Sequence, residues 1–414
     1  MYLQRIMKEN KNCKKILFLT PRLPYPIIGG DRLKAYYMLK HLSTKHKVTL
    51  VSFYQGDQKK CKEYTKAIEE LGIQVFVLPL TPLKAGLTIL PRLFDSIPLE
   101  VLYYTQKAYF NIVEELLNTQ KFDIVFSFFM RTAEYVKNNK NLKKILMCED
   151  CRTLYQKRSA ENTSNLLQKL VRFWEYNKLK KYEPSIVNFF DIITLVTNDD
   201  INSMKTQNSK PYYKLLTNGV DIDKFVFKSI DRSDKTILFA GKLDVWANEL
   251  MINSIINFIL PIIVKEIPNV KLQIVGANPS KKIRMLSKTY KNIELVANVP
   301  EMFPYLHKAT LFLHPHLGGS GIQNKLLEAM AAGCPVVTTT TGNQGINAIH
   351  GEEVLIGNNN EELAKCAINI LKSSELANYL SLNARSLIEN THSWDIIFAQ
   401  LDDIVDNLYN KTKI

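Results

Sequence analysis

Residues 318–337, GGSGIQNKLLEAMAAGCPVV, decide the fold. The glycines of Gly318–Gly321 predict a loop, and the apolar spacing over 322–332 predicts a short amphipathic helix. Gly333 ends that helix before the next strand begins. Because Leu311–Leu313 reads as a buried strand, the order is strand, glycine loop, helix, strand. That order is typical of an α/β domain that presents backbone N–H groups to a phosphate.

The predicted helix carries one lysine, Lys325, and one carboxylate, Glu328. Residues three apart lie on neighbouring faces of a helix. A cation and an acceptor beside an anion-binding loop suit a nucleotide diphosphate. Taken alone, the motif favours an ordinary βαβ turn with a solvated Lys–Glu pair, since short glycine motifs are weak indicators.

Length and composition predict a two-domain globular protein. A chain of 414 residues exceeds a single core, and 46% hydrophobic with 23% charged residues is ordinary for such proteins. The N-terminal MYLQRIMKEN lacks the apolar core of a signal peptide. The longest apolar run, Ile255–Val264, is interrupted by Asn257 and Pro261 and is too short to span a bilayer. We therefore expect a cytoplasmic protein.

The net charge of +14 is concentrated in the N-terminal part of the chain. Residues 1–230 contain 37 Lys and Arg against 22 Asp and Glu, whereas residues 231–414 contain 17 against 18. A basic surface suggests an anionic partner, here an acidic membrane or a phosphorylated substrate, since no nucleic-acid-binding motif is present. Lysine-rich solvated faces explain the excess equally well.

The six cysteines are scattered and form no disulfide framework. Cys148 and Cys151 are spaced as CxxC, but no second pair or His-x-His partner completes a zinc site. We read both as structural residues and predict no metal site.

Strand and helix patterns alternate twice along the chain, which predicts two doubly wound α/β domains. In the first, strand Lys15–Thr20 leads through a Pro-rich loop to Gly29-Gly30 and a helix capped by Asp31. Gly29 and Gly30 precede a helix N-terminus and form a second candidate anion site. A long helical stretch over 162–182 is expected to end before Pro184.

Two further stretches of the first half are candidates for ligand or membrane binding. Glu149, Asp150 and Arg152 follow a predicted strand, and ligands gather beyond the carboxyl ends of parallel strands, although a solvated loop is the simpler alternative. The apolar piece Leu83–Phe94, flanked by basic residues, suits either a membrane surface or, as we favour, packing on its own domain.

Four passages in order resemble the GT-B glycosyltransferases, specifically family 4. They are the strand leading to Gly29-Gly30-Asp31-Arg32, the linker TNGVDIDKF, the loop FAGKLDVWANE and GSGIQNKLLEAMAAGCPVV. The resemblance covers nearly the whole chain. It implies an acceptor-binding domain over 1–214, a linker over 215–226 and a nucleotide-sugar domain over 227–392. A final helix over 393–414 would pack back on the first domain, and a cleft would separate the two domains.

The resemblance also implies roles for individual residues. Glu328 would accept hydrogen bonds from the ribose, Lys242 and Lys325 would neutralise the diphosphate, and Asp150 would serve the acceptor side. The remaining donor-binding residues would be those of the glycine loops and the helix start: Gly29, Gly30, Gly241, Gly319, Ser320, Gly321 and Asn324.

Two features depart from the usual family pattern. The first glutamate of the Glu-x7-Glu motif falls at Ser320, and the usual Leu-Pro is Asn324-Lys325, as in a GIQNK branch of the family. No histidine lies between residues 47 and 306, where many members carry one in the cleft. Glu149, Asp150 or Arg152 would then take its place.

The implied reaction is sugar transfer from a nucleotide diphosphate sugar to a saccharide or lipid-linked acceptor, with retention and without a metal or cofactor. No DxD stands where a Mg²⁺ bridge would be expected, since Asp221-Ile222-Asp223 lies in the linker. Two alternatives remain: a nucleotide-sugar epimerase of the same fold, and a non-catalytic member that binds saccharide or lipid. An NAD-dependent dehydrogenase is disfavoured because neither first strand precedes a GxGxxG.

Overall fold

The computed structural model describes residues 13–163, 165–228 and 234–410. The N-terminal stretch MYLQRIMKEN lies outside these ranges. Chain contacts divide the molecule into two compact units. The first comprises the chain up to Leu216, Gly319–Gly321 and the chain from Phe398 onwards, and the second comprises Thr217–Gly318 and Ile322–Ile397.

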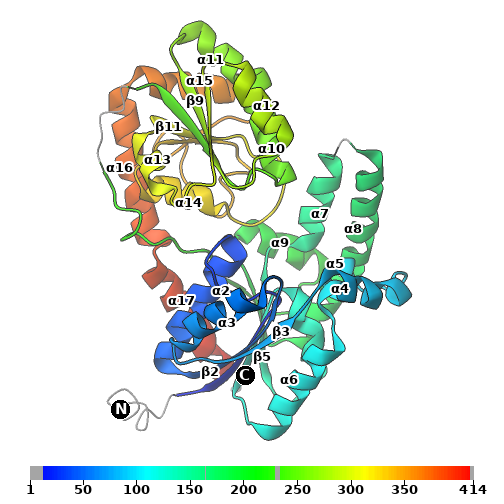
Figure 1. Ribbon diagram of the computed structural model, residues 1–414. Coiled ribbons are helices and arrows are strands. Elements are labelled where there is room, and N and C mark those ends of the chain that lie inside the picture. The colour runs from blue at the N-terminus through cyan, green and yellow to red at the C-terminus, as the bar shows by residue number, and fades with distance from the viewer. Residues whose placement is uncertain (1–12, 164, 229–233, 411–414) are drawn as a thin grey trace. The chain divides into compact units, whose positions relative to one another are not determined.

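The first unit is built on a seven-stranded parallel sheet in the order β3-β2-β1-β4-β5-β6-β7, with helices packed on it (Figure 1). Continuous apolar runs such as KILFLT form its central strands, as expected of a sheet covered on both faces. The strands are β1 (Lys15–Thr20), β2 (Lys47–Tyr54), β3 (Gln74–Pro79), β4 (Ile124–Phe128), β5 (Lys143–Glu149), β6 (Ile192–Leu195) and β7 (Tyr213–Leu215).

Helical segments connect these strands. They are α2 (Gly30–Lys45), α3 (Gln58–Glu69), α4 (Pro82–Ile89), η1 (Leu90–Arg92), α5 (Leu99–Tyr104), α6 (Lys107–Thr119), η2 (Met130–Tyr135), α7 (Arg152–Glu161), α8 (Leu166–Ile186), η3 (Val187–Phe189) and α9 (Asn198–Gln207).

The second unit is built on a six-stranded parallel sheet in the order β10-β9-β8-β11-β12-β13. Its strands are β8 (Thr236–Ala240), β9 (Lys271–Gly276), β10 (Ile293–Ala297), β11 (Leu311–His314), β12 (Val336–Thr338) and β13 (Leu355–Ile356). Its helices are α10 (Trp246–Ser254), η4 (Ile255–Ile259), α11 (Leu260–Glu266), α12 (Lys281–Thr289), α13 (Phe303–Lys308), α14 (Asn324–Ala331), α15 (Asn360–Lys372) and α16 (Ser374–Thr391). The prediction of two doubly wound α/β domains is confirmed.

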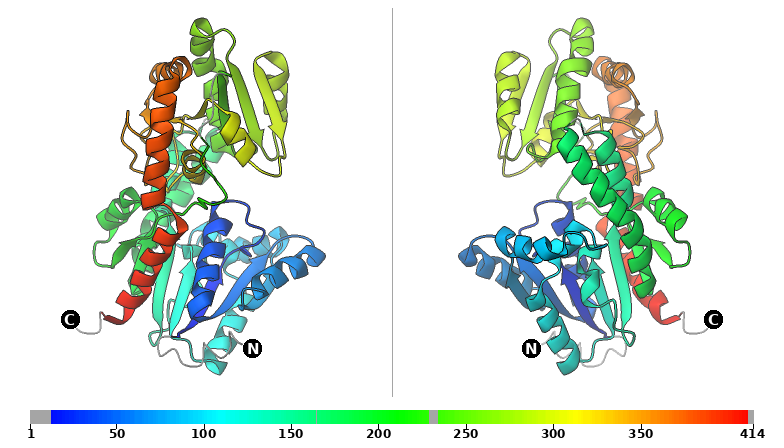
Figure 2. Two further views of the ribbon diagram at one scale, coloured as in Figure 1. Left: turned by 90° about the vertical axis from the view of Figure 1, so that its left-hand side faces the viewer. Right: turned by 90° about the vertical axis from the view of Figure 1, so that its right-hand side faces the viewer.

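The last helix, α17 (Trp394–Asn410), begins in the second unit and continues into the first. Within the first unit it packs against α2 (Figure 2). The Phe398 ring stacks on His41 at 4.3 Å between ring centroids, and Asp402 Oδ1 lies 2.9 Å from His41 Nε2.

Two local predictions are wrong, and a third holds in part. Gly29, rather than Asp31, is the N-cap of α2, and Asp31 lies inside the first turn, where a carboxylate suits the helix dipole. Helix α8 continues through Pro184 to Ile186, and an additional strand, β7, follows α9. The expectation that Leu83–Phe94 packs on its own domain holds in part, because Ala85 lies in the first unit's core whereas Leu83, Leu87, Leu90 and Phe94 are exposed.

The apolar run at Ile255–Val264 is part of a longer helical stretch than the sequence suggested. Trp246–Glu266 is helical over 21 residues with a mean hydropathy of 1.6, so by length and composition it is able to cross a membrane. Ile252, Ile256 and Ile263 of this stretch lie in the hydrophobic core of the second unit. Core packing therefore explains its apolar composition without a bilayer.

Candidate functional site

The first cluster of predicted site residues lies within the second unit, after β8. Lys325, on α14, donates from Nζ to Asn248 Oδ1 at 2.8 Å. Asn248, on α10, donates from Nδ2 to the carbonyl oxygen of Lys242 at 2.7 Å. The structure thus joins Lys325 to the Gly241–Lys242 loop, which lies about eighty residues earlier in the chain.

This loop approaches its neighbours so closely that two glycines are required. A Cβ on Gly241 would lie 2.9 Å from Asn248 Nδ2 and 3.2 Å from Lys325 Nζ. A Cβ on Gly276, at the end of the adjacent β9, would lie 1.7 Å from the carbonyl oxygen of Gly241. Both have positive φ, which L-residues rarely adopt. The loop therefore presents bare backbone beside a cation.

The environment of Lys325 is apolar and carries little compensating charge. Burial lowers the pKa of its ammonium to about 8, and nearby Glu328 only partly offsets this. The buried His314 adjoins it: burial first, and then Lys325, holds the pKa of His314 well below its usual range. Neither ring nitrogen of His314 has a hydrogen-bond partner among the described residues. A cation held among neutral groups is suited to an anionic ligand.

Glu328 follows Lys325 on α14 by three residues. Burial raises the pKa of its carboxyl to about 7, against the opposing effects of Lys224 and Lys325. At the start of the same helix, Asn324 Oδ1 accepts from Asn218 Nδ2 at 2.7 Å, so the linker turn is attached to α14. Lys242 differs: its half-exposed ammonium lies 3.6 Å from Asp244 Oδ2, and only its backbone joins the Lys325 cluster.

The second cluster lies within the first unit, where β5 ends. Glu149 is the last residue of β5 and has φ of 68°, a strained conformation for a residue with a side chain. Its Oε1 lies 3.0 Å from the Nζ of buried Lys34 on α2. Burial raises the pKa of Glu149 and lowers that of Lys34, and their mutual attraction opposes both shifts.

Asp150 and Arg152 belong to a network of ion pairs. Arg152 Nε donates to Glu100 Oε1 at 2.9 Å, and an Arg152 terminal nitrogen lies 3.3 Å from Asp150 Oδ2. Arg131 pairs with the other oxygen of Glu100 at 2.9 Å. Although burial opposes it, the two arginines lower the pKa of Glu100 to about 2. The alternative of a solvated loop at these residues is therefore excluded, because their charges are largely buried and paired.

The glycine loop of the opening stretch contacts this second cluster, since Gly319–Gly321 group with the first unit. Ser320 Oγ donates to Asp150 Oδ2 at 2.6 Å, and the Gly321 N–H donates to Asp200 Oδ2 at 3.2 Å. Ser320, where the resemblance led us to expect a glutamate, is thus a hydrogen-bond donor to Asp150.

The other predicted glycines form the N-terminus of α2. Gly29 is its N-cap, with φ of 94°, and α2 begins at Gly30. Nearby, Arg22 lies 3.4 Å from Asp31 Oδ2 and donates from Nε to the Tyr104 hydroxyl at 3.0 Å.

Sequence reasoning missed three residues that complete these clusters. Asn248 is the next-to-last residue of the quoted FAGKLDVWANE motif, so its signal was present. His314 and Glu100 carried no local signal, because only the packing of distant elements brings them beside Lys325 and Arg152. Among the described residues, no group of three or more His, Cys, Asp or Glu side chains is placed to hold a metal ion. Cys148 and Cys151 are buried and form no disulfide.

Comparisons with known proteins agree with the fold. Residues 234–373 match the family described as "Glycosyl transferases group 1". An uncharacterized 44.6 kDa protein in the cps region of Klebsiella pneumoniae is 25% identical over 401 residues, covering 94% of this chain and 98% of that protein. Phosphatidyl-myo-inositol mannosyltransferase of Mycobacterium tuberculosis is 28% identical over 131 residues, covering 30% of this chain and 34% of that protein.

Among solved structures, the HepE protein of Anabaena, in complex with UDP and glucose, has a TM-score of 0.66 at 14% identity. The match covers 95% of this chain and 100% of that structure. The chain therefore has the GT-B fold, and residues 234–373 of its second unit are similar to the glycosyl transferases group 1 family. Together these findings support a glycosyltransferase. The GIQNK branch and the roles of individual residues stay predictions.

Proposed function

We propose that this protein transfers a sugar from a nucleotide diphosphate sugar to a saccharide or lipid-linked saccharide, in the synthesis of a bacterial surface polysaccharide. The observation that carries the proposal is the buried Lys325 ammonium, held by Asn248 beside the bare backbone of Gly241. That arrangement suits a diphosphate leaving group, whose developing charge needs fixed positive groups in a dry site.

In the proposed reaction, the bond between the anomeric carbon and the diphosphate oxygen breaks. A bond to the acceptor oxygen forms on the same face, and the departing phosphate takes the acceptor proton. Lys325 stabilises the leaving group and Lys242 adds a more exposed charge. Glu328 accepts hydrogen bonds from the ribose hydroxyls, and no metal is needed. Asp150 serves the acceptor, and Gly29 and Gly30 face the phosphate.

Relatives support the choice of substrates. The Klebsiella relative comes from a cps region, the mycobacterial relative is named for a phosphatidyl-myo-inositol acceptor, and HepE was solved with UDP-glucose. We propose by analogy a nucleotide-sugar donor and a polysaccharide or lipid-linked acceptor. A lipid-linked acceptor would place the protein at the cytoplasmic face of the membrane.

A donor panel tests the proposal. Purified full-length protein is titrated calorimetrically with UDP-, GDP-, ADP- and dTDP-sugars, and the best binder is then incubated with and without candidate acceptors. We expect binding of one nucleotide class and acceptor-dependent release of its diphosphate. Interconversion of the sugar without acceptor would indicate an epimerase, and absence of binding to every nucleotide would indicate a non-catalytic saccharide-binding protein.

A further inference from the structure

Large apolar side chains of the first unit are exposed on two segments. On α4, η1 and the residues that follow, Leu83, Leu87, Leu90 and Phe94 are exposed, Phe94 to 92%. On the first two turns of α8, Leu166, Leu167, Leu170 and Phe173 are exposed, Leu166 to 78%. We call these two segments, Leu83–Phe94 and Leu166–Phe173, the apolar arm.

Hydrogen bonds join the part of α8 that follows Phe173 to the chain at and beyond the end of the Leu83–Phe94 segment. Lys178, one turn beyond Phe173 on α8, donates from Nζ to the carbonyl oxygen of Leu93 at 2.6 Å. Glu175 accepts from the backbone N–H groups of Leu99 and Glu100 at 3.0 and 3.1 Å. The chain that ends the Leu83–Phe94 segment is therefore held against α8, and both exposed segments belong to the first unit.

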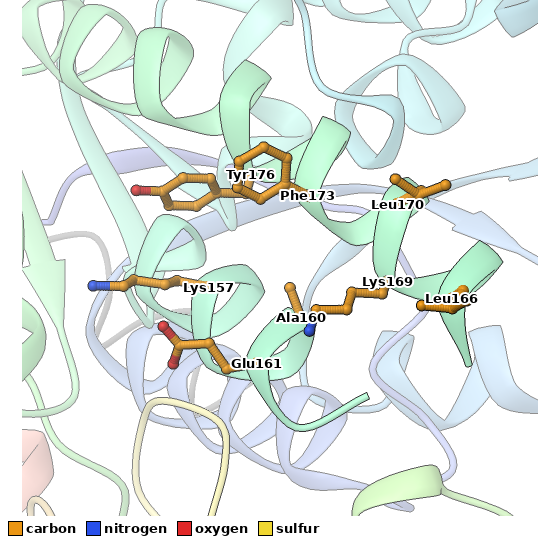
Figure 3. A pocket seen from close by; sticks show the side chains of 8 residues that line it. All are labelled: Lys157, Ala160, Glu161, Leu166, Lys169, Leu170, Phe173 and Tyr176. Atoms are coloured by element: carbon orange, nitrogen blue, oxygen red, sulfur yellow. The ribbon is translucent and has the colours of Figure 1, made fainter. Parts of the chain in front are cut away.

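The surface is hollowed between α7 and α8, which run side by side (Figure 3). The cavity has a volume of about 530 Å³. Leu170, Phe173 and Tyr176 line it from α8, and Lys157 lies on its α7 side. Glu161 also lies on the α7 side, next to Lys157, so the lining is apolar from α8 and of mixed charge from α7.

Basic residues surround the apolar arm. Between Lys157 and Lys181 the chain has seven Lys and Arg against two Asp and Glu, and Leu83–Phe94 contains Lys84 and Arg92, of which Arg92 is paired with Asp95. Apolar side chains interspersed with cations are typical of helices that lie at the surface of an anionic bilayer. A second copy of the chain fits this surface poorly, because a symmetric contact would bring the same cations together.

We propose that the apolar arm docks this protein on an anionic phospholipid bilayer. Leu166, Leu170 and Phe94 enter the boundary between headgroups and acyl chains, and the flanking lysines and arginines bind lipid phosphates. The inference deepens the proposed function by naming the surface at which a lipid-linked acceptor is met. Its test does not depend on sugar transfer.

Vesicle flotation of the purified full-length protein tests the docking. We expect binding to phosphatidylcholine vesicles that contain phosphatidylglycerol, little binding to phosphatidylcholine alone, and weakening with added salt. Leu170→Glu and Phe94→Glu each lower the partition coefficient about tenfold, because a charge replaces an inserted apolar side chain.

Two variants of the second unit are matched controls. Leu382 and Phe258 are exposed to 57% and 59%, so Leu382→Glu and Phe258→Glu should bind vesicles as the unaltered protein does. All four variants should bind the donor with unchanged affinity, which separates lost docking from misfolding or a failed site. Vesicle binding by Leu170→Glu and Phe94→Glu equal to that of the controls overturns the proposal. The proposal is also overturned if the unaltered protein binds neither kind of vesicle and forms a dimer that Leu170→Glu dissociates.

Discussion

The two charged clusters of the molecule differ in whether their central buried group is paired with opposite charges. In the first unit, Glu100 is paired with both Arg131 and Arg152, and the pKa of its carboxyl falls to about 2 although burial opposes this. Around Lys325 in the second unit, the ammonium is held by a neutral amide, and its pKa falls to about 8 because burial is not compensated. A paired network stabilises the fold, whereas an under-compensated cation is suited to a charged ligand.

The largest expected effect comes from removing the under-compensated cation. Lys325→Ala should lower sugar transfer about a hundredfold or more, as loss of one preorganised donor to a developing charge does. Acceptor-dependent diphosphate release measures it, with Lys265→Ala, an exposed lysine of α11, as control. Glu328→Ala should also lower transfer strongly. Near-normal turnover in both site variants would show that the site lies elsewhere.

Removing a member of the paired network should instead affect stability. Arg152→Ala leaves buried Glu100 with one cation and should lower the free energy of unfolding by about 3 kcal/mol. Arg92→Ala breaks a more exposed pair with Asp95 and should cost less than about 1 kcal/mol. Urea denaturation compares the two. Equal decreases in the free energy of unfolding would mean that the ion pairs of Arg152 contribute no more to stability than the exposed pair of Arg92.

The lowered pKa of Lys325 predicts how donor binding depends on pH. Below about pH 8 the ammonium is charged, and above it the affinity for a nucleoside diphosphate should fall, approaching about tenfold per pH unit. The ligand-free protein should gain stability from this group as pH rises from about 8 towards 10.5, since the unfolded chain holds the proton more tightly.

Calorimetric titration between pH 7 and 9.5 with the diphosphate of the best-binding donor measures this dependence. Lys325→Arg stays charged over that range and should remove the decline. A decline that persists unchanged in the arginine variant would assign the titration to another group.

The smallest effect should come from Lys242. Its ammonium is half-exposed and beside Asp244, so Lys242→Ala should reduce transfer only about fivefold, on the order of 1 kcal/mol. The ratio of the transfer rates of Lys242→Ala and Lys325→Ala therefore tests whether the buried lysine contributes more to transfer than the exposed one. Equal losses would show that the Lys242 side chain turns towards the donor when it binds.

Periodicity and turn residues predicted the strands well. Lys15–Thr20 begins and ends where expected, and the strand expected at Leu311–Leu313 is one residue longer, because each is a short apolar run bounded by polar residues. Boundaries that depend on neighbours were less predictable. Pro184 did not end α8, whose buried Tyr182, Glu183 and Ile186 hold the helix in the first unit's core.

The sequence alone determined the doubly wound α/β class, the glycine loops and the presence of Lys325 and Glu328 on one short helix. These follow from local order and spacing. Only the tertiary structure decided which charges are paired, because pairing depends on the packing of distant elements. Lys34 reaches Glu149 and Arg152 reaches Glu100, but Lys325 meets a neutral asparagine. Both sites are buried, so the presence or absence of an opposite charge separates an ion pair from a cation suited to a ligand.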